Sequence, residues 1–255
     1  MAAETHLFRC RSDNYGVLIR DTASGAVAAI DAPETPAVDA ALKATGWTLT
    51  DILVTHHHAD HTDGIADLKA KYKCRVVAPR AEAGKIPLVD ETVREGDKVS
   101  VGNLSGNVIE TPGHTLGHIA YWFGGDKLAF AGDTLFSIGC GRVNEGTMEM
   151  MWASLLKLRG LPGDTRVYCG HEYTLANIKF AQTVEPDNAA LAARAQQAAR
   201  QVAAAQPTIP TTIDEEKAAN PFLRADVAAV AAAVGLTGKS AAEVFAEIRN
   251  RKNRF

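Results

Sequence analysis

The run His56-His57-His58-Ala59-Asp60-His61 constrains this chain more than any other feature. Five ionisable side chains in six consecutive positions would be costly to bury unless a cation lay among them. The preceding residues 51–54 are apolar and partly β-branched, which predicts a buried strand. Residues 62–72 carry apolar side chains at helical spacing. We therefore predict a strand, a metal-binding loop and a helix.

The surrounding sequence predicts an α/β layered domain. Apolar runs at 15–19 and 26–30 flank a polar turn, which is typical of a hairpin, and a helix is expected between Thr35-Pro36 and Gly46. The other predicted strands are 75–78, 98–101, 107–109, 120–123, 128–131 and 166–169, with a further helix at 148–158. Strands that alternate with helices favour layers of sheet and helix.

The composition changes after about residue 173. Residues 189–205 are rich in alanine, residues 226–234 are apolar, and Ser240-Ala241-Ala242-Glu243 is a capping box that predicts a last helix. We therefore predict two domains, a catalytic domain at 1–172 and a helical substrate-binding domain at 173–255.

Composition excludes several classes of protein. The net charge of −3 argues against a molecule-wide nucleic-acid surface, and four scattered cysteines do not form a disulfide framework. The chain lacks a signal-peptide pattern and an apolar run of about 18 residues. We expect a cytoplasmic monomer that acts on a small molecule and has neither a nucleic-acid nor a membrane partner.

Three more metal-capable residues, His114, Asp133 and His171, follow strand-like runs, and each comes directly after a glycine. Ligands gather where strands end in open α/β sheets, so these residues could join the histidine run. The candidate ligands are His56, His58, Asp60, His61, His114, Asp133 and His171. This set exceeds what one tetrahedral ion needs and suits two ions about 3.5–4 Å apart with a bridging carboxylate.

The motif His56-x-His58-x-Asp60-His61, with the three later residues, resembles the metallo-β-lactamase superfamily. Further motifs are similar to glyoxalase II, the hydroxyacylglutathione hydrolases, over nearly the whole chain. These are Gly139–Arg142, Glu145–Thr147, Gly170–Thr174, Asn220–Arg224 and the terminal Arg249, Lys252 and Phe255. The resemblance implies a four-layer αββα sandwich followed by a small helical domain.

The resemblance also implies the role of each candidate residue. His56, His58 and His114 would hold the first ion, Asp60, His61 and His171 the second, and Asp133 would bridge them. The glutathione part of the substrate would be bound by Arg142, Asn144, Tyr173, Arg249 and Lys252. Asn144 departs from the family pattern, because many members have an aromatic residue there.

Structural roles are expected for several other residues of these types. We expect His6, His57 and His118 to be structural or solvent-exposed, and Cys140 and Cys169 to be buried, inert thiols. Tyr173 could pack between the domains, and the basic C-terminal residues could be a solvated helix end.

Two bound ions would explain a hydrolytic reaction without a serine or cysteine nucleophile. A hydroxide that bridges them exists near neutral pH because metal lowers the pKa of water to about 7. A thiolate of pKa about 8.5 leaves without a general acid, so a thioester fits. The resemblance narrows the substrate to S-(2-hydroxyacyl)glutathione, chiefly S-D-lactoylglutathione, with Asp60 and Asp133 as catalytic ligands. Zinc is the expected metal, with iron or manganese as alternatives.

Two other functions remain open. A related superfamily enzyme could act on another ester, a lactone or a persulfide, and its metal count would distinguish a mononuclear member. A metal-dependent binding module is the non-enzymatic alternative, which turnover of any thioester would exclude.

Overall fold

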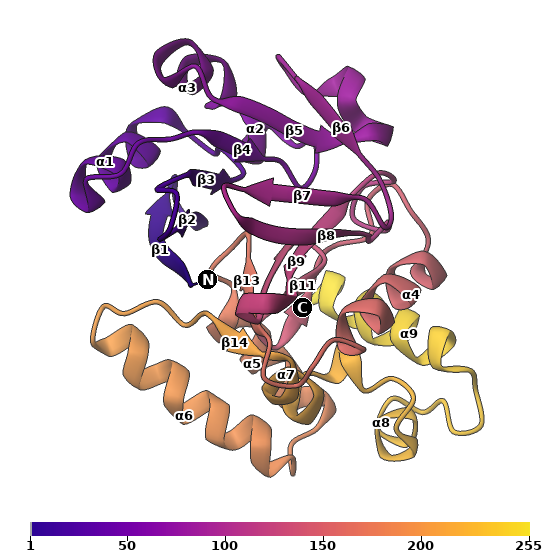
Figure 1. Cartoon of the computed structure of the whole chain (residues 1–255). Coiled ribbons are helices and arrows are strands. Elements are labelled where there is room, and N and C mark those ends of the chain that lie inside the picture. Colours follow the sequence, from indigo (N-terminus) through magenta and orange to yellow (C-terminus); the bar gives the residue numbers. More distant parts are fainter. Residues whose placement is uncertain (1) are drawn as a thin grey trace. The chain divides into compact units, whose positions relative to one another are not determined.

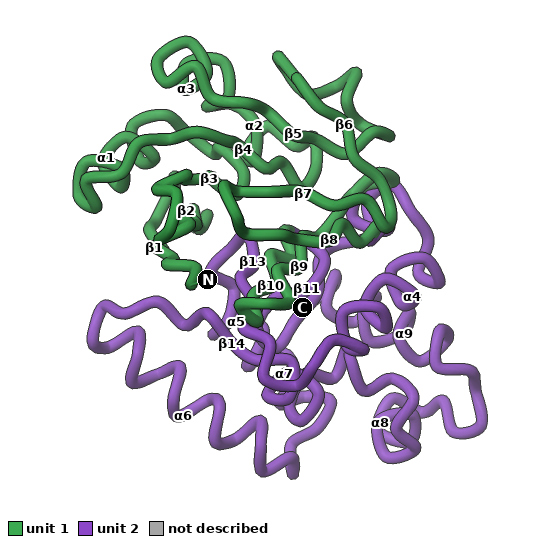
Figure 2. Tube along the Cα trace, viewed as in Figure 1, with its two compact units in different colours: residues 1–110, 115–132 green, residues 111–114, 133–255 purple. Residues whose placement is uncertain are grey.

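The computed structural model describes residues 2–255 and contains two compact units (Figure 2). Unit 1 comprises Met1–Glu110 and Thr115–Gly132, and unit 2 comprises Thr111–His114 and Asp133–Phe255. Residues 133–171 therefore cluster with the helical C-terminal region. The functional boundary at 172/173 stays a prediction, because compactness alone does not define which residues bind substrate.

A six-stranded sheet forms the first half of unit 1 (Figure 1). Its strands lie in chain order: β1 (Ala3–Cys10), β2 (Asn14–Asp21), β3 (Val27–Ile30), β4 (Asp51–Leu53), β5 (Arg75–Pro79) and β6 (Glu91–Val93). The pairs β1–β2 and β2–β3 are antiparallel, and Val17 lies opposite Ile30, which confirms the predicted hairpin. The pairs from β3 to β6 are parallel, so the chain must cross over between these strands.

Helices α1 (Thr35–Thr45) and α3 (Ile65–Tyr72) pack on one face of this sheet. Val38 and Leu68 share a buried cluster with Ile52 and Val76 of the central strands. Helix α1 ends where Gly46 adopts a φ of 71°, as its position predicted. Its N-cap is Glu34, one residue before the predicted Thr35, and it makes no side-chain capping bond.

The second sheet of unit 1 is antiparallel and contains β7 (Lys98–Val101), β8 (Leu104–Glu110), β9 (Ile119–Phe123) and β10 (Leu128–Gly132). A 3-10 turn, η2 (Gly124–Asp126), joins the last two strands. The two sheets are joined by Tyr121, which is fully buried and donates its hydroxyl to the Val54 carbonyl at 2.7 Å. The predicted strands at 98–101, 107–109, 120–123 and 128–131 are confirmed.

Unit 2 is mostly helical. Two short antiparallel pairs, β11 (Leu135–Phe136) with β12 (Gly139–Cys140) and β13 (Arg166–Cys169) with β14 (Thr211–Thr212), accompany its helices. The helices are α4 (Met148–Arg159), α5 (Thr174–Val184), α6 (Ala189–Ala203), α7 (Ile213–Ala219), η3 (Pro221–Leu223), α8 (Ala228–Ala233) and α9 (Ala241–Arg254). Ser240 and Glu243 form the predicted capping box at the start of α9.

Buried polar side chains connect the helices of unit 2 to the β11–β12 hairpin. Glu216 accepts a hydrogen bond from the Ile138 backbone N–H at 2.9 Å, and Asn220 donates to the Gly139 carbonyl at 3.0 Å. Arg249 donates to the Cys140 carbonyl at 2.8 Å. The segment that follows Asp133 is therefore held by α7 and α9.

The structure differs from the sequence predictions at several elements. β1 and β6 were not predicted, since neither contains an apolar run. The helix expected at 62–72 is two helices, α2 (Ala59–Thr62) and α3, separated by Asp63 and Gly64. Among residues 2–255, no helix combines the length and apolar character needed to cross a bilayer.

Candidate metal centre

The ligand loop of unit 1 begins where β4 ends. Asp31 is buried and accepts hydrogen bonds from the backbone N–H and the hydroxyl of Thr55, at 2.7 and 2.8 Å. These bonds hold the chain as it leaves the sheet. Helix α2 then carries Asp60 and His61 in its single turn. We call residues His56, His58, Asp60 and His61 the first ligand set.

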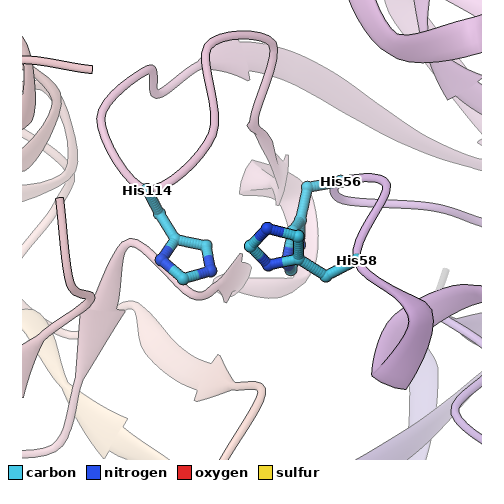
Figure 3. Close-up of side chains that lie close together, drawn as sticks. All are labelled: His56, His58 and His114. Carbon is cyan, nitrogen blue, oxygen red and sulfur yellow. The ribbon is translucent and has the colours of Figure 1, made fainter. Parts of the chain in front are cut away.

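The imidazoles of the first ligand set lie close together. The His56 ring centroid is 4.7 Å from that of His58 and 4.2 Å from that of His61. Candidate ligand atoms of His56 lie within 4.8 Å of those of His58 and of His61. Those of Asp60 and His61 are equally close to each other. Figure 3 shows His56 and His58 on the loop after β4 and His114 on a separate segment. Imidazole nitrogens and carboxylate oxygens grouped in this way are donor atoms that a divalent cation binds.

The hydrogen bonds of His61 direct one nitrogen toward a cation. Its Nδ1 lies 2.7 Å from Asp31 Oδ2, and an ionised carboxylate can only accept, so Nδ1 donates. In neutral His61 the Nε2 atom therefore has a lone pair, yet it lies 3.7 Å from Asp60 Oδ2. Two electron-rich atoms that face each other suit a cation between them. A carboxylate behind a histidine is also the usual outer partner of a metal ligand.

The second ligand set, His114, Asp133 and His171, lies in unit 2 and shows the same pattern. Asp133 Oδ2 is 3.5 Å from His114 Nε2 and 3.3 Å from His171 Nε2. His114 donates from Nδ1 to the Arg142 carbonyl at 2.8 Å, so in its neutral form Nε2 has the lone pair. One carboxylate thus faces two imidazoles, which fits a carboxylate shared by cations. The donor types in both sets suit zinc, iron or manganese.

Glycines allow the sharp turns that precede two of these ligands. Gly113 has a φ of 150° and Gly132 a φ of 48°. A Cβ on Gly132 would lie 2.7 Å from both His118 Nε2 and Thr55 Oγ1, so the strand end also needs this close approach.

The predicted substrate-binding residues have different environments within unit 2. Arg142 and Asn144 are exposed, and the Tyr173 ring stacks on the His171 ring at 4.9 Å and 2°. Lys252 donates to the Ala176 carbonyl at 2.9 Å. Arg249 is only 4% exposed, so it is less accessible than a basic helix end suggests.

Lys252 lies in a positive environment. Burial, together with the charges of Arg249 and Arg142, lowers its pKa to about 8. Cations that repel one another are stabilised when an anion binds among them. This part of unit 2 is therefore suited to a carboxylate.

The expected inert thiols are confirmed. All four cysteines are buried and unbridged. Burial raises the pKa of Cys140 to about 11 and that of Cys169 to about 12, so neither thiol is ionised near neutral pH.

Sequence reasoning missed two buried carboxylates that position the ligand loop. Asp31 contacts Thr55 and His61, and Glu82 contacts His57. Neither stands near the histidines in sequence. The only available signal was that Asp31 directly follows the apolar run of a predicted strand.

Comparison with known proteins decides the family. The sequence model described as the metallo-beta-lactamase superfamily matches residues 10–171, and the one described as hydroxyacylglutathione hydrolase C-terminus matches residues 172–255. A hydroxyacylglutathione hydrolase of Rhodopseudomonas palustris (strain BisB5) is 64% identical over 253 residues, which are 99% of each chain. This chain belongs to the hydroxyacylglutathione hydrolase family.

Solved structures support the same fold for this hydroxyacylglutathione hydrolase family member. ETHE1 from Myxococcus xanthus has a TM-score of 0.70 and 30% sequence identity, covering 99% of this chain and 92% of its own. TTHA1623, solved in a di-iron-bound form, has a TM-score of 0.55 and 27% identity, covering 62% and 87%. The predicted class, a metallo-β-lactamase sandwich followed by a helical region, is confirmed. The family and the His and Asp groups also support divalent metal binding.

Proposed function

We propose that this protein hydrolyses S-(2-hydroxyacyl)glutathione thioesters, chiefly S-D-lactoylglutathione, to a 2-hydroxy acid and glutathione. The observation that carries the proposal is full-length identity of 64% to a relative named hydroxyacylglutathione hydrolase, with the donor atoms of both ligand sets in place. The reaction would be the second step of methylglyoxal detoxification.

The two ligand sets would together hold two divalent ions. His56, His58 and His114 would bind the first ion, Asp60, His61 and His171 the second, and Asp133 both. In support, His56, His58, Asp60 and His61 place neighbouring candidate ligand atoms within 4.8 Å in unit 1, and Asp133 Oδ2 lies 3.5 Å from His114 Nε2 and 3.3 Å from His171 Nε2 in unit 2. His61 and His114, whose Nδ1 atoms contact Asp31 and the Arg142 carbonyl, would bind through Nε2.

Two divalent ions, when bound, supply a water whose pKa is lowered to about 7 and stabilise the oxyanion that follows attack. Asp60 and Asp133 would fix the ions and compensate part of their charge. No side chain has to protonate the departing thiolate, because its pKa is about 8.5. Zinc fits the donors, and the di-iron form of TTHA1623 supports iron as an alternative.

The glutathione part would be recognised by Arg142, Asn144, Tyr173, Arg249 and Lys252. Mutual repulsion among Arg142, Arg249 and Lys252 supports binding of a carboxylate there. Because Arg249 is buried and already donates to the Cys140 carbonyl, its contribution would be partly to hold that backbone. We also propose that the protein is a cytoplasmic monomer and that residues 173–255 form its substrate-binding domain.

Thioester turnover measured beside elemental analysis tests this function. We expect two metal ions per fully active chain and a preference for S-D-lactoylglutathione over thioesters that lack the glutathione carboxylates. One ion per fully active chain would contradict the two-ion assignment. Metal binding without turnover of any thioester would instead indicate a binding module.

A further inference from the structure

Glu82 is a buried carboxylate that contacts the ligand loop without belonging to either ligand set. It lies in η1 (Arg80–Lys85), after β5, and is 2% exposed. Its Oε2 accepts from the His57 backbone N–H at 2.7 Å and lies 2.9 Å from His57 Nδ1. Since an ionised carboxylate only accepts, His57 Nδ1 donates to it. Oε2 of Glu82 therefore fixes both the backbone and the side chain of His57.

The other oxygen of Glu82 fixes a second loop of unit 1. Oε1 accepts from the Gly117 backbone N–H at 2.8 Å. A Cβ on Gly117 would lie only 2.6 Å from Glu82 Cγ, so the loop approaches closer than another residue would allow. One residue further, the His118 ring lies 4.8 Å from the His56 ring. Glu82 thus connects the peptide that follows His56 to the loop that carries His118.

His57 stands between two residues of the first ligand set and is not in that set. Fixing its N–H fixes the peptide that joins His56 to His57, and the bond at Nδ1 turns its ring toward Glu82. Thr62 adds a hydroxyl bond to the His58 carbonyl at 3.0 Å. The backbone from 56 to 58 is therefore held at both ends before any ion binds.

Asp31 and Glu82 contact different parts of the ligand loop. Asp31 contacts the ring of His61, which the proposed assignment gives to the second ion, and also the Thr55 hydroxyl, which lies 3.0 Å from Nδ1 of His56. Within the ligand loop, Glu82 contacts the peptide and ring of His57, which stands between His56 and His58, the loop residues assigned to the first ion. We propose that Glu82, acting through His57, is a positioning residue for the first ion alone. This inference rests on the proposed function for the division of ligands between ions.

A change of Glu82→Gln tests the inference with little change in volume. The amide can accept at one position only, so either the His57 or the Gly117 bond is lost. Loss of an outer partner lowers metal affinity by about 10–100-fold. We expect one of the two ions to leave at a chelator concentration lower by that factor, while the other leaves as in the wild type. Metal content is measured after dialysis against graded chelator.

Asp21→Asn is the matched control. Asp21 is also a fully buried carboxylate of unit 1 that accepts backbone N–H groups, from Ala23 at 3.0 Å and Asn103 at 2.8 Å, but it contacts no ligand. Its change should lower stability and leave the release of both ions unaltered. His57→Ala removes the side-chain bond to Glu82 and keeps the backbone bond, so its effect on release of the first ion should be smaller than that of Glu82→Gln. This variant tests the proposal even if Glu82→Gln fails to fold.

Amide hydrogen exchange in the metal-free protein reports directly on the backbone bonds to Glu82, which an activity assay does not. The amide of His57 or that of Gly117, whichever bond is lost, should exchange faster in Glu82→Gln, while the Thr55 amide, bonded to Asp31, should not. Equal release of both ions, or release identical to the wild type, would overturn the positioning role. A wild type that holds one ion or does not hydrolyse thioesters would overturn the proposed function instead, whatever the variants do.

Discussion

The two ligand sets differ in how the chain builds them. The first set occupies one continuous run, and two buried carboxylates, Asp31 and Glu82, contact that run from neighbouring elements of unit 1. The second set comes from three separate positions of unit 2; the His114 ring donates to the Arg142 carbonyl, and helices hold the segment after Asp133. The first set is therefore encoded locally, and the second depends on the packing of the C-terminal helices.

This difference determines what a single substitution can remove. A ligand within the first run has neighbours that could still hold an ion, because four candidate ligands stand within six positions. Asp133 has no such neighbour in sequence, and its carboxylate faces two imidazoles of its own set.

The largest effect is expected for Asp133→Ala. If Asp133 serves both ions, its loss should empty both sites and lower kcat by on the order of 10³-fold, comparable to the loss of a main transition-state contact. Metal content and thioester hydrolysis measure this. His171→Ala is the comparison, and it should weaken chiefly the second ion. Retention of two ions in Asp133→Ala would show that the second set does not share its carboxylate.

The elements that the sequence revealed are those with local signals. β3, β4 and β5 are short apolar runs, and the capping box at Ser240 and the glycine at 46 define helix ends through bonds a few residues apart. β1 is exposed at Glu4 and Arg9 and half-buried between them, so its strand character depends on pairing with β2.

The metal ligands could be predicted residue by residue because their types and spacing are specific, but their supports could not. Asp31 stands 24 positions before Thr55, and Glu82 stands 25 positions after His57. Both carboxylates reach the ligand loop only once the sheet has formed. Arg249 was predicted to bind glutathione, with a solvated helix end as the alternative. It is in fact buried and donates to the Cys140 carbonyl, with its guanidinium 5.2 Å from the Phe222 ring. Tertiary packing decides such contacts, and sequence spacing does not encode it.

Glu216 offers a way to disturb the support of the second set without touching a ligand. Burial raises its pKa from 4.5 to about 7, although hydrogen bonds from Ile138 and Asn220 and the charge of Arg194 oppose this shift. The folded protein then binds this proton more tightly than the unfolded chain, so the contribution of Glu216 to stability falls as the pH rises from about 4.5 to about 7.

Glu216→Gln should remove this pH dependence. A shift of that size corresponds to on the order of 3 kcal/mol, so the difference in unfolding free energy between wild type and variant should change by about that amount from pH 4.5 to 8. Denaturant unfolding at several pH values measures it, and the other titrating groups cancel in the difference. A constant difference across this range would mean that Glu216 does not titrate in the fold.

The smallest effect is expected at Lys252, where a substitution tests substrate binding in unit 2 and not metal binding. The cations proposed to bind glutathione all lie in unit 2, so substrate affinity should change while both ions stay bound. A contact made equally in the ground and transition states changes KM and leaves kcat alone. Lys252→Met, which keeps an apolar stem near the Phe180 and Phe255 rings, should raise KM for S-D-lactoylglutathione about tenfold, as expected for one charge-assisted bond of about 1.5 kcal/mol.

The pH dependence of the same variant separates charge from packing. Because the pKa of Lys252 is lowered to about 8, the free enzyme loses this charge as the pH rises through 8, and kcat/KM should fall there in the wild type. Lys252→Met should lack that fall, and Lys252→Arg should keep its activity to higher pH because guanidinium stays charged. If Lys252→Met retained both the wild-type KM and the fall near pH 8, Lys252 would serve only to hold the Ala176 carbonyl, and carboxylate recognition would rest on Arg142 and Arg249.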